Sequence, residues 1–339
     1  MNNLKKVGLS ALAGSLAMVN ANAIDMTVTG EAQAVYSTAQ GNETGGEASN
    51  GKGIGVDTDL HFNASGELDN GFTISVAHVL DTDTNVTNSS TQLAVGMGSL
   101  GTIQFNDVGG ASSNGIDDVL PFAYEEPWDG TSTTSEFNIF GSQLNKGSIT
   151  YKTPSYDMMG VTMSATYDYD PSASDTAPPT AGSVAEDGAS AEAFTVTLAH
   201  ESGLTIGGGH SKVADTNATK GEEGATGYVK YSNGGLSVGY QEFYYDAAHK
   251  SAEGADSEGD GYAIAYTAGD VSISYGVQKE TKAAVSDTAA LLEEELSAFQ
   301  AAYTMGGMTI AASLYETDNV EGVTGIKYEE TELSVSFAF

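Results

Sequence analysis

The chain has 339 residues, a formal net charge of −34 at pH 7, no cysteine, and twelve basic residues that are all lysines. Nucleic-acid binding needs clustered cations, so this balance excludes nucleic acid as a partner. The lack of arginine excludes bidentate guanidinium clamps on phosphate, and the lack of cysteine excludes a disulfide framework. A surface this acidic attracts cations.

The first 23 residues have the organisation of an export signal. Lys5 and Lys6 precede a short apolar stretch from 7 to 19, and Ala21-Asn22-Ala23 is a small-x-small cleavage site. We therefore predict a cleaved signal peptide at 1–23 and a mature domain at 24–339. No later stretch approaches about 18 uninterrupted apolar residues, so no membrane-spanning helix is expected.

The mature chain alternates apolar and polar residues in sixteen segments, which is typical of strands with two different faces. Residues 289–301 could instead form a short helix in a loop. The predicted strands are 24–39, 56–64, 72–76, 92–98, 103–105, 148–153, 161–169, 194–198, 204–206, 227–231, 236–240, 262–266, 271–277, 299–305, 308–314 and 333–339.

Short turns alternate with long polar loops along these strands. Asp69-Asn70-Gly71 and Gly306-Gly307 are tight turns, whereas 40–52 and 171–190 are long. A soluble sandwich has no reason for this asymmetry, but a transmembrane β-barrel does. About sixteen strands would enclose an aqueous lumen. Tyrosines recur toward strand ends, where interfacial girdles lie, although β-propensity explains any single one: Tyr36, Tyr167, Tyr169, Tyr262, Tyr266, Tyr275 and Tyr303.

The last strand carries the first family resemblance. Leu333, Val335, Phe337 and Phe339 share one face and small polar residues share the other. The chain in this respect resembles the outer-membrane β-barrels of Gram-negative bacteria, in which the final Phe is the signal read by the assembly machinery. The alternative is an amphipathic strand that ends a soluble sheet.

The long connection at 108–147, between the fifth and sixth strands, carries the second resemblance. It combines six carboxylates with Phe122, Tyr124, Trp128 and other aromatics that could pack against a wall. The chain resembles the trimeric general porins, whose third external loop folds into the barrel and narrows the lumen. Their opposing wall often carries arginines. This chain has no arginine, so either lysines take that place or the electric field across the lumen, between the acidic loop and the opposing wall, is weaker.

The resemblance and strand alternation together give candidate constriction residues. Strand alternation also places Glu31, Asp57, Asp59, His61 and Asp168 on the inward face, where they could simply solvate the lumen. The constriction candidates are the loop acids Asp117, Asp118, Glu125, Glu126 and Asp129 and the inward lysines Lys152 and Lys230.

Other chemistry has little support in the sequence. Five histidines are scattered without metal-ligand spacing, and no catalytic motif is present, so neither a cofactor nor an enzyme is expected. Residues 81–85, Asp-Thr-Asp-Thr-Asn, resemble the start of a calcium loop but lack its Gly and distal Glu. A loop-bound Ca²⁺ is possible there, and a plain polar loop is the alternative.

We therefore expect an all-β, sixteen-stranded antiparallel barrel in the outer membrane. It would be a homotrimer in contact with lipid and lipopolysaccharide, and it would pass small hydrophilic solutes and ions by passive diffusion with a preference for cations. A solute-selective channel and a secreted or surface-displayed adhesive β-protein are the alternatives. Saturable conductance would indicate a solute-selective channel. Extraction without detergent would indicate the secreted or surface-displayed adhesive protein.

Overall fold

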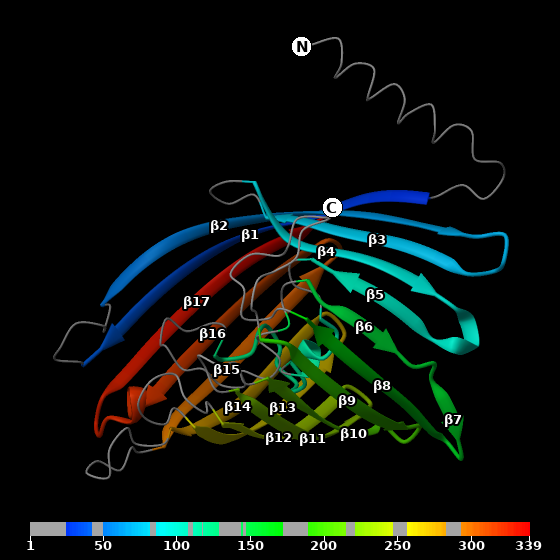
Figure 1. Ribbon diagram of the computed structural model, residues 1–339. Coiled ribbons are helices and arrows are strands. Elements are labelled where there is room, and N and C mark those ends of the chain that lie inside the picture. Colours follow the sequence, from blue (N-terminus) through cyan, green and yellow to red (C-terminus); the bar gives the residue numbers. More distant parts are fainter. Residues whose placement is uncertain are drawn as a thin grey trace.

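The strands form a single closed antiparallel sheet (Figure 1). The computed structural model describes residues 25–42, 50–81, 86–107, 111–116, 118–128, 144, 147–171, 189–214, 221–246, 256–282 and 293–339. The first strand, β1 (Asp25–Gly41), pairs with both β2 (Gly51–Glu67) and the last strand, β17 (Lys327–Ala338), so the sheet has no free edge. Closure of this kind pairs every strand with two neighbours, as a barrel in lipid requires.

The sheet contains seventeen strand segments that make sixteen staves. β6 (Ile149–Lys152) and β7 (Tyr156–Met158) both pair with β8 (Val161–Asp170), so they are two parts of one stave, and 17 − 1 = 16. Pro154 lies in the interruption between them, where a residue without an N–H cannot donate a hydrogen bond to the ladder. The predicted strand number is confirmed.

The remaining strands follow in chain order, each paired with its sequence neighbour. Most are longer than predicted because the ladder continues beyond the apolar alternation; β10, for example, extends from the predicted 204–206 to Leu204–Val213. Residues 294–301 lie in a strand, so the loop-helix alternative is wrong there. The bounds are β3 (Thr73–Asp81), β4 (Thr87–Gly96), β5 (Thr102–Asn106), β9 (Ala191–His200), β10 (Leu204–Val213), β11 (Glu223–Asn233), β12 (Leu236–Asp246), β13 (Ser257–Ala268), β14 (Val271–Lys282), β15 (Glu294–Met305) and β16 (Met308–Asp318), with 3₁₀ turns at Gly98–Leu100, Asn114–Ile116 and Val320–Gly322.

The two faces of the barrel wall differ as alternation predicts. Ile273 is 43% exposed on the outside, whereas its neighbour Ser274 is 3% exposed on the inside. The outer face carries exposed apolar and tyrosine side chains along nearly every stave, and the inner face carries glutamine, serine, threonine and acids. An apolar exterior around a polar interior is the organisation of a barrel in lipid. Each tyrosine predicted for the girdles is exposed on the outer face.

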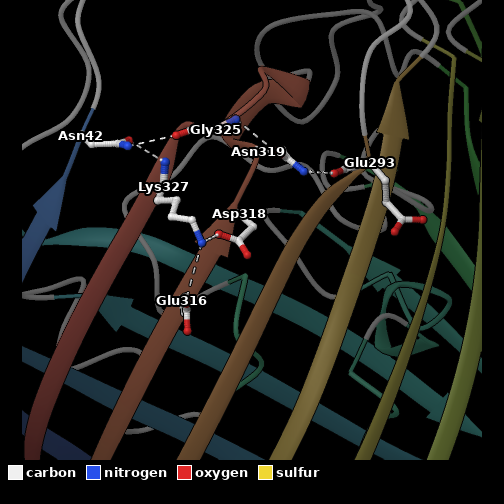
Figure 2. Close-up of polar contacts among 7 residues, drawn as sticks. All are labelled: Asn42, Glu293, Glu316, Asp318, Asn319, Gly325 and Lys327. Carbon is white, nitrogen blue, oxygen red and sulfur yellow. Dashed lines mark hydrogen bonds and ion pairs between the residues drawn. The ribbon is translucent and has the colours of Figure 1, made fainter.

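Polar contacts close the seam at the end of the barrel that carries the long connections. A polar network ties the start of β17 to the end of β1 (Figure 2). Lys327 Nζ lies 2.5 Å from Asp318 Oδ1, and the Lys327 backbone N–H donates to Asn42 Oδ1 over 2.7 Å. Asn42 Nδ2 in turn donates to the carbonyl of Gly325 over 2.9 Å. These contacts stabilise the seam at which the chain closes on itself.

Within the described part of the chain, no helix is both long enough and apolar enough to cross a membrane. The signal peptide predicted at 1–23 lies outside the described residues.

Candidate functional site

The segment of residues 111–128 that follows β5, called here the loop segment, is fixed at its start by a buried carboxylate. Asp168 on β8 is fully buried and accepts hydrogen bonds from the backbone N–H groups of Ser112 and Ser113, over 3.3 and 2.8 Å. The hydroxyl of Thr150 on β6 donates to the same carboxylate. Three donors therefore converge on the Asp168 carboxylate, which fixes the start of the loop segment to β8.

Two small apolar clusters hold the loop segment against the wall. The first joins loop side chains, with Leu144, to alanines of β9: Ala111, Ile116, Val119, Leu144, Ala191 and Ala193. The second places Trp128 against Leu296 and Ala298 of β15 and Tyr315 of β16. Both clusters place buried apolar side chains between the loop segment and the wall, and their burial favours docking in proportion to the area removed from water.

Three fully buried glutamines on the inner wall hold the loop segment by its polar groups. Gln241 on β12 donates to the carbonyl of Ile116 over 2.8 Å. Gln300 on β15 donates to the carbonyl of Glu125 over 2.6 Å and accepts from the N–H of Tyr124 over 3.0 Å. Gln278 on β14 makes the third such contact, with Glu126. An irregular segment needs partners of this kind because its buried backbone groups have none in a ladder.

Two inward glycines leave room for loop rings. A Cβ at Gly239 on β12 would lie 2.9 Å from Cδ of Pro121, and one at Gly276 on β14 would lie 2.5 Å from the Phe122 ring. Any larger residue at these positions would displace the loop segment. A glycine inside a strand is a known mark of close approach by another part of the chain.

Glu126 is enclosed between the loop segment and the wall. It is 6% exposed, and its carboxylate accepts from Trp128 Nε1, the Leu120 N–H and Gln278 Nε2 over 3.1, 3.2 and 2.9 Å. Burial raises the pKa of Glu126 to about 8, although these three hydrogen bonds oppose the rise. Glu126 is therefore mostly protonated at pH 7, and its main physical effect is to hold the loop.

Glu125 lies at the other side of the loop segment, next to a wall acid. Its Oε1 accepts from the hydroxyl of Tyr315 over 2.7 Å, and its carboxyl lies beside that of Glu332 on β17. The neighbouring Tyr124 hydroxyl accepts from Gln33 Nε2 on β1 over 2.9 Å. The loop segment thus contacts inward residues from β8 to β1, with two carboxyls side by side at its far end.

The structure keeps the predicted constriction lysines apart from the loop acids that it describes. Asp117 and Asp129 lie outside the described residues, and Asp118 is exposed on the loop segment. Lys152 on β6 and Lys230 on β11 are half-buried at the inward positions that alternation predicts. Within the described ranges, no hydrogen bond or ion pair joins these lysines to the loop acids.

The inward positions predicted on β1 and β2 are confirmed by the strand register. Glu31 pairs with Asp59, and His61 and Asp57 lie two residues to either side of Asp59 on the same face. Asp81, the first residue of the possible calcium loop, pairs with Asp59 from β3. Residues 82–85 of that loop lie outside the described part, so the calcium prediction remains a prediction.

Sequence reasoning missed the residues that hold the loop. Gln241, Gln278 and Gln300 look like any other polar inward residue, and one sequence gives no sign that they contact a distant segment. Gly239 and Gly276 did carry a signal, since each interrupts a strand of larger residues.

This architecture agrees with the sequence comparison. The sequence profile of Gram-negative porins matches residues 8–339. The chain belongs to the Gram-negative porin family. It is thus a multi-pass β-barrel porin of the outer membrane that forms a channel. Family membership places it among channel-forming barrels rather than among secreted adhesive β-proteins. No similar protein was found among curated sequences.

Solved porin structures share the fold at low sequence identity. The trimer form of OmpT, an outer membrane protein of Vibrio cholerae, is 12% identical with a TM-score of 0.65, over 93% of this chain and 99% of that one. An anion-selective porin from Comamonas acidovorans is 11% identical with a TM-score of 0.63, over 93% and 100%. A porin refined at 1.8 Å is 16% identical with a TM-score of 0.62, over 93% and 100%. These likenesses concern the fold.

Proposed function

We propose that this porin is a water-filled channel for passive diffusion of small hydrophilic solutes and ions, that it prefers cations, and that the loop segment narrows its lumen. The narrowing is supported by the hydrogen bonds that fix the loop segment to inward side chains of β8, β12, β14 and β15. A channel of this kind needs no catalytic step and no cofactor.

The observation that carries the cation preference is the pair of carboxyls of Glu125 and Glu332 at the end of the loop segment, which share a hydrogen bond and so carry one negative charge between them. Further acids occupy inward positions of β1 and β2. Inward lysines are fewer on the described strands. Two unit charges about 4 Å apart interact by about 1 kcal/mol in water and about 4 kcal/mol at an effective dielectric constant of 20. A wet constriction lies between these limits, enough to bias permeation without closing the pore.

The assembly we propose is a homotrimer in the outer membrane, in contact with lipid and lipopolysaccharide. Its support is the solved trimer form of the V. cholerae protein, which shares the fold. The C. acidovorans porin is named as anion-selective, which is the opposite of the preference proposed here. The shared fold therefore does not determine ion selectivity, and side chains in the lumen must determine it.

The test is the reversal potential of the reconstituted channel in a salt gradient. A cation preference supports the proposal and an anion preference contradicts it. Conductance that saturates with one solute would favour the alternative of a solute-selective channel; linear conductance would favour general diffusion.

A further inference from the structure

Five side chains with metal-binding atoms share one patch of the inner wall on β1, β2 and β3. The loop segment contacts this part of the wall through the hydrogen bond between Gln33 on β1 and Tyr124. Glu31 on β1, Asp59 on β2 and Asp81 on β3 are directly opposite one another in the strand register, so three carboxylates form a row across three strands. Asp57 and His61 flank Asp59 on the same face of β2. Like charges in directly opposed positions destabilise strand pairing.

The donor atoms converge on Asp59. One ligand atom from each of Glu31, Asp59 and His61 lies within 4.8 Å of the other two. The same holds for Asp57, Asp59 and Asp81, so the two groups share one carboxylate. Two ligands of a single Zn²⁺ ion, each at about 2.0–2.2 Å, are at most about 4.4 Å apart, so a small side-chain rotation closes either set.

His61 distinguishes this patch from an ordinary cluster of acids. Among the histidines that the structure describes, His78, His200 and His210 belong to the outward face and His61 alone faces the lumen. A space of about 450 Å³ lies against it, lined by Thr29, Gly30, Glu31, His61, Ala338 and Phe339. The imidazole can therefore reach both a ligand from the lumen and the neighbouring carboxylates.

We propose that Glu31, Asp59 and His61 bind a divalent transition-metal ion on the lumen wall, with Asp57 and Asp81 beside it. One imidazole nitrogen with two carboxylate oxygens is a ligand set suited to Zn²⁺, whereas Ca²⁺ and Mg²⁺ prefer oxygen alone. The bound ion would convert the repulsion within the carboxylate row into attraction. Water from the lumen would complete its coordination, as in zinc sites with three protein ligands.

The direct test is calorimetric titration of Zn²⁺ into the folded full-length protein in detergent micelles. The variants are His61→Gln and Asp59→Asn, with His200→Gln, a histidine on the outer face, as the matched control. Losing a metal ligand should weaken Zn²⁺ binding by at least the roughly 10–100-fold typical of losing an outer-shell partner. His200→Gln should bind as the wild type does. Binding unchanged in His61→Gln, or lost equally in His200→Gln, would overturn the proposal.

Two further readouts cover the remaining outcomes. If Zn²⁺ binding is insensitive to His61 but Ca²⁺ binding needs Asp59, the site is an oxygen-only site and the proposal is wrong. If Asp59→Asn does not fold, chemical modification of the wild type decides: Zn²⁺ should slow carbethoxylation of His61 and leave that of His200 unchanged, and equal rates at His61 with and without Zn²⁺ would refute the site. None of these measurements depends on the ion preference of the channel.

Discussion

Gly30 and Phe339 close the barrel by exchanging two backbone hydrogen bonds. The Gly30 N–H donates to the Phe339 carbonyl over 2.7 Å, and the Phe339 N–H donates to the Gly30 carbonyl over 2.9 Å. A Cβ at Gly30 would lie 2.6 Å from Cε2 of the Phe339 ring, so a side chain at this position would push that ring aside. The last residue of the chain is thus held by a residue near the start of the first strand.

Replacing Gly30 by valine should displace the Phe339 ring and weaken closure. Because the Phe339 ring is 66% exposed and can move, the loss of stability should lie at or below the low end of the roughly 1–3 kcal/mol that overpacking of a core typically costs, and thermal or urea unfolding in detergent measures it. Gly55→Val on β2 is the matched control, because a Cβ there meets nothing within 4 Å. An equal loss of stability in both variants would mean that the effect of valine comes from replacing a strand glycine and not from the contact with Phe339.

Deleting Phe339 should impair insertion into the outer membrane. The deletion removes the last pair of hydrogen bonds of the closing seam, and the resemblance to outer-membrane barrels makes this residue the assembly signal. The measurement is the yield of heat-modifiable barrel in isolated outer membranes. A truncated chain that inserts at the normal yield would contradict both roles of Phe339.

Lysine on the outer face should be costly where lysine on the inner face is not. Val196, Ile273 and Ile310 are exposed on the lipid side, so lysine at any of them should cost about 2–4 kcal/mol near the midplane. The controls are Thr197 and Thr309, which face the lumen. Folding equilibria in lipid vesicles measure the difference, and equal costs on both faces would contradict the orientation of the wall.

Ser274 does not belong with those tolerant positions, although alternation alone would place it there. Its hydroxyl accepts a hydrogen bond from the N–H of Ala123 over 2.9 Å, and the residue is buried under the loop segment.

Alternation predicted the number of staves and the face of each residue, because in lipid the outer face must be apolar. It could not predict which inward residues hold the loop, because Gln278, Gln300 and Ser274 differ from solvated neighbours only through a segment more than 100 residues away. For the same reason Glu126 was expected to act through its charge, whereas its surroundings favour the neutral form.

Docking of the loop segment should weaken as pH rises. Below the ordinary carboxyl pKa of 4.5, Glu126 is protonated whether or not the loop is docked. Between 4.5 and about 8 the released carboxyl binds fewer protons than the docked one, so docking loses stability with rising pH, and the loss is complete above about 8. Open-channel current noise should therefore increase from pH 6 to pH 9. Glu126→Gln should remove this pH dependence, and a wild-type profile in that variant would contradict the role of Glu126.

If lumen carboxyls make the channel prefer cations, the reversal potential in a salt gradient will show that preference. The reversal potential of the wild-type channel should have the sign that indicates a preference for cations. Neutralising Glu125 and Glu332 together, as Glu125→Gln and Glu332→Gln, should shift the potential toward anions. Neutralising Glu242 and Glu258, which lie on the outer face, should change it less, since screening over about 8 Å at physiological salt confines the effect. A wild-type channel that already prefers anions would contradict the account.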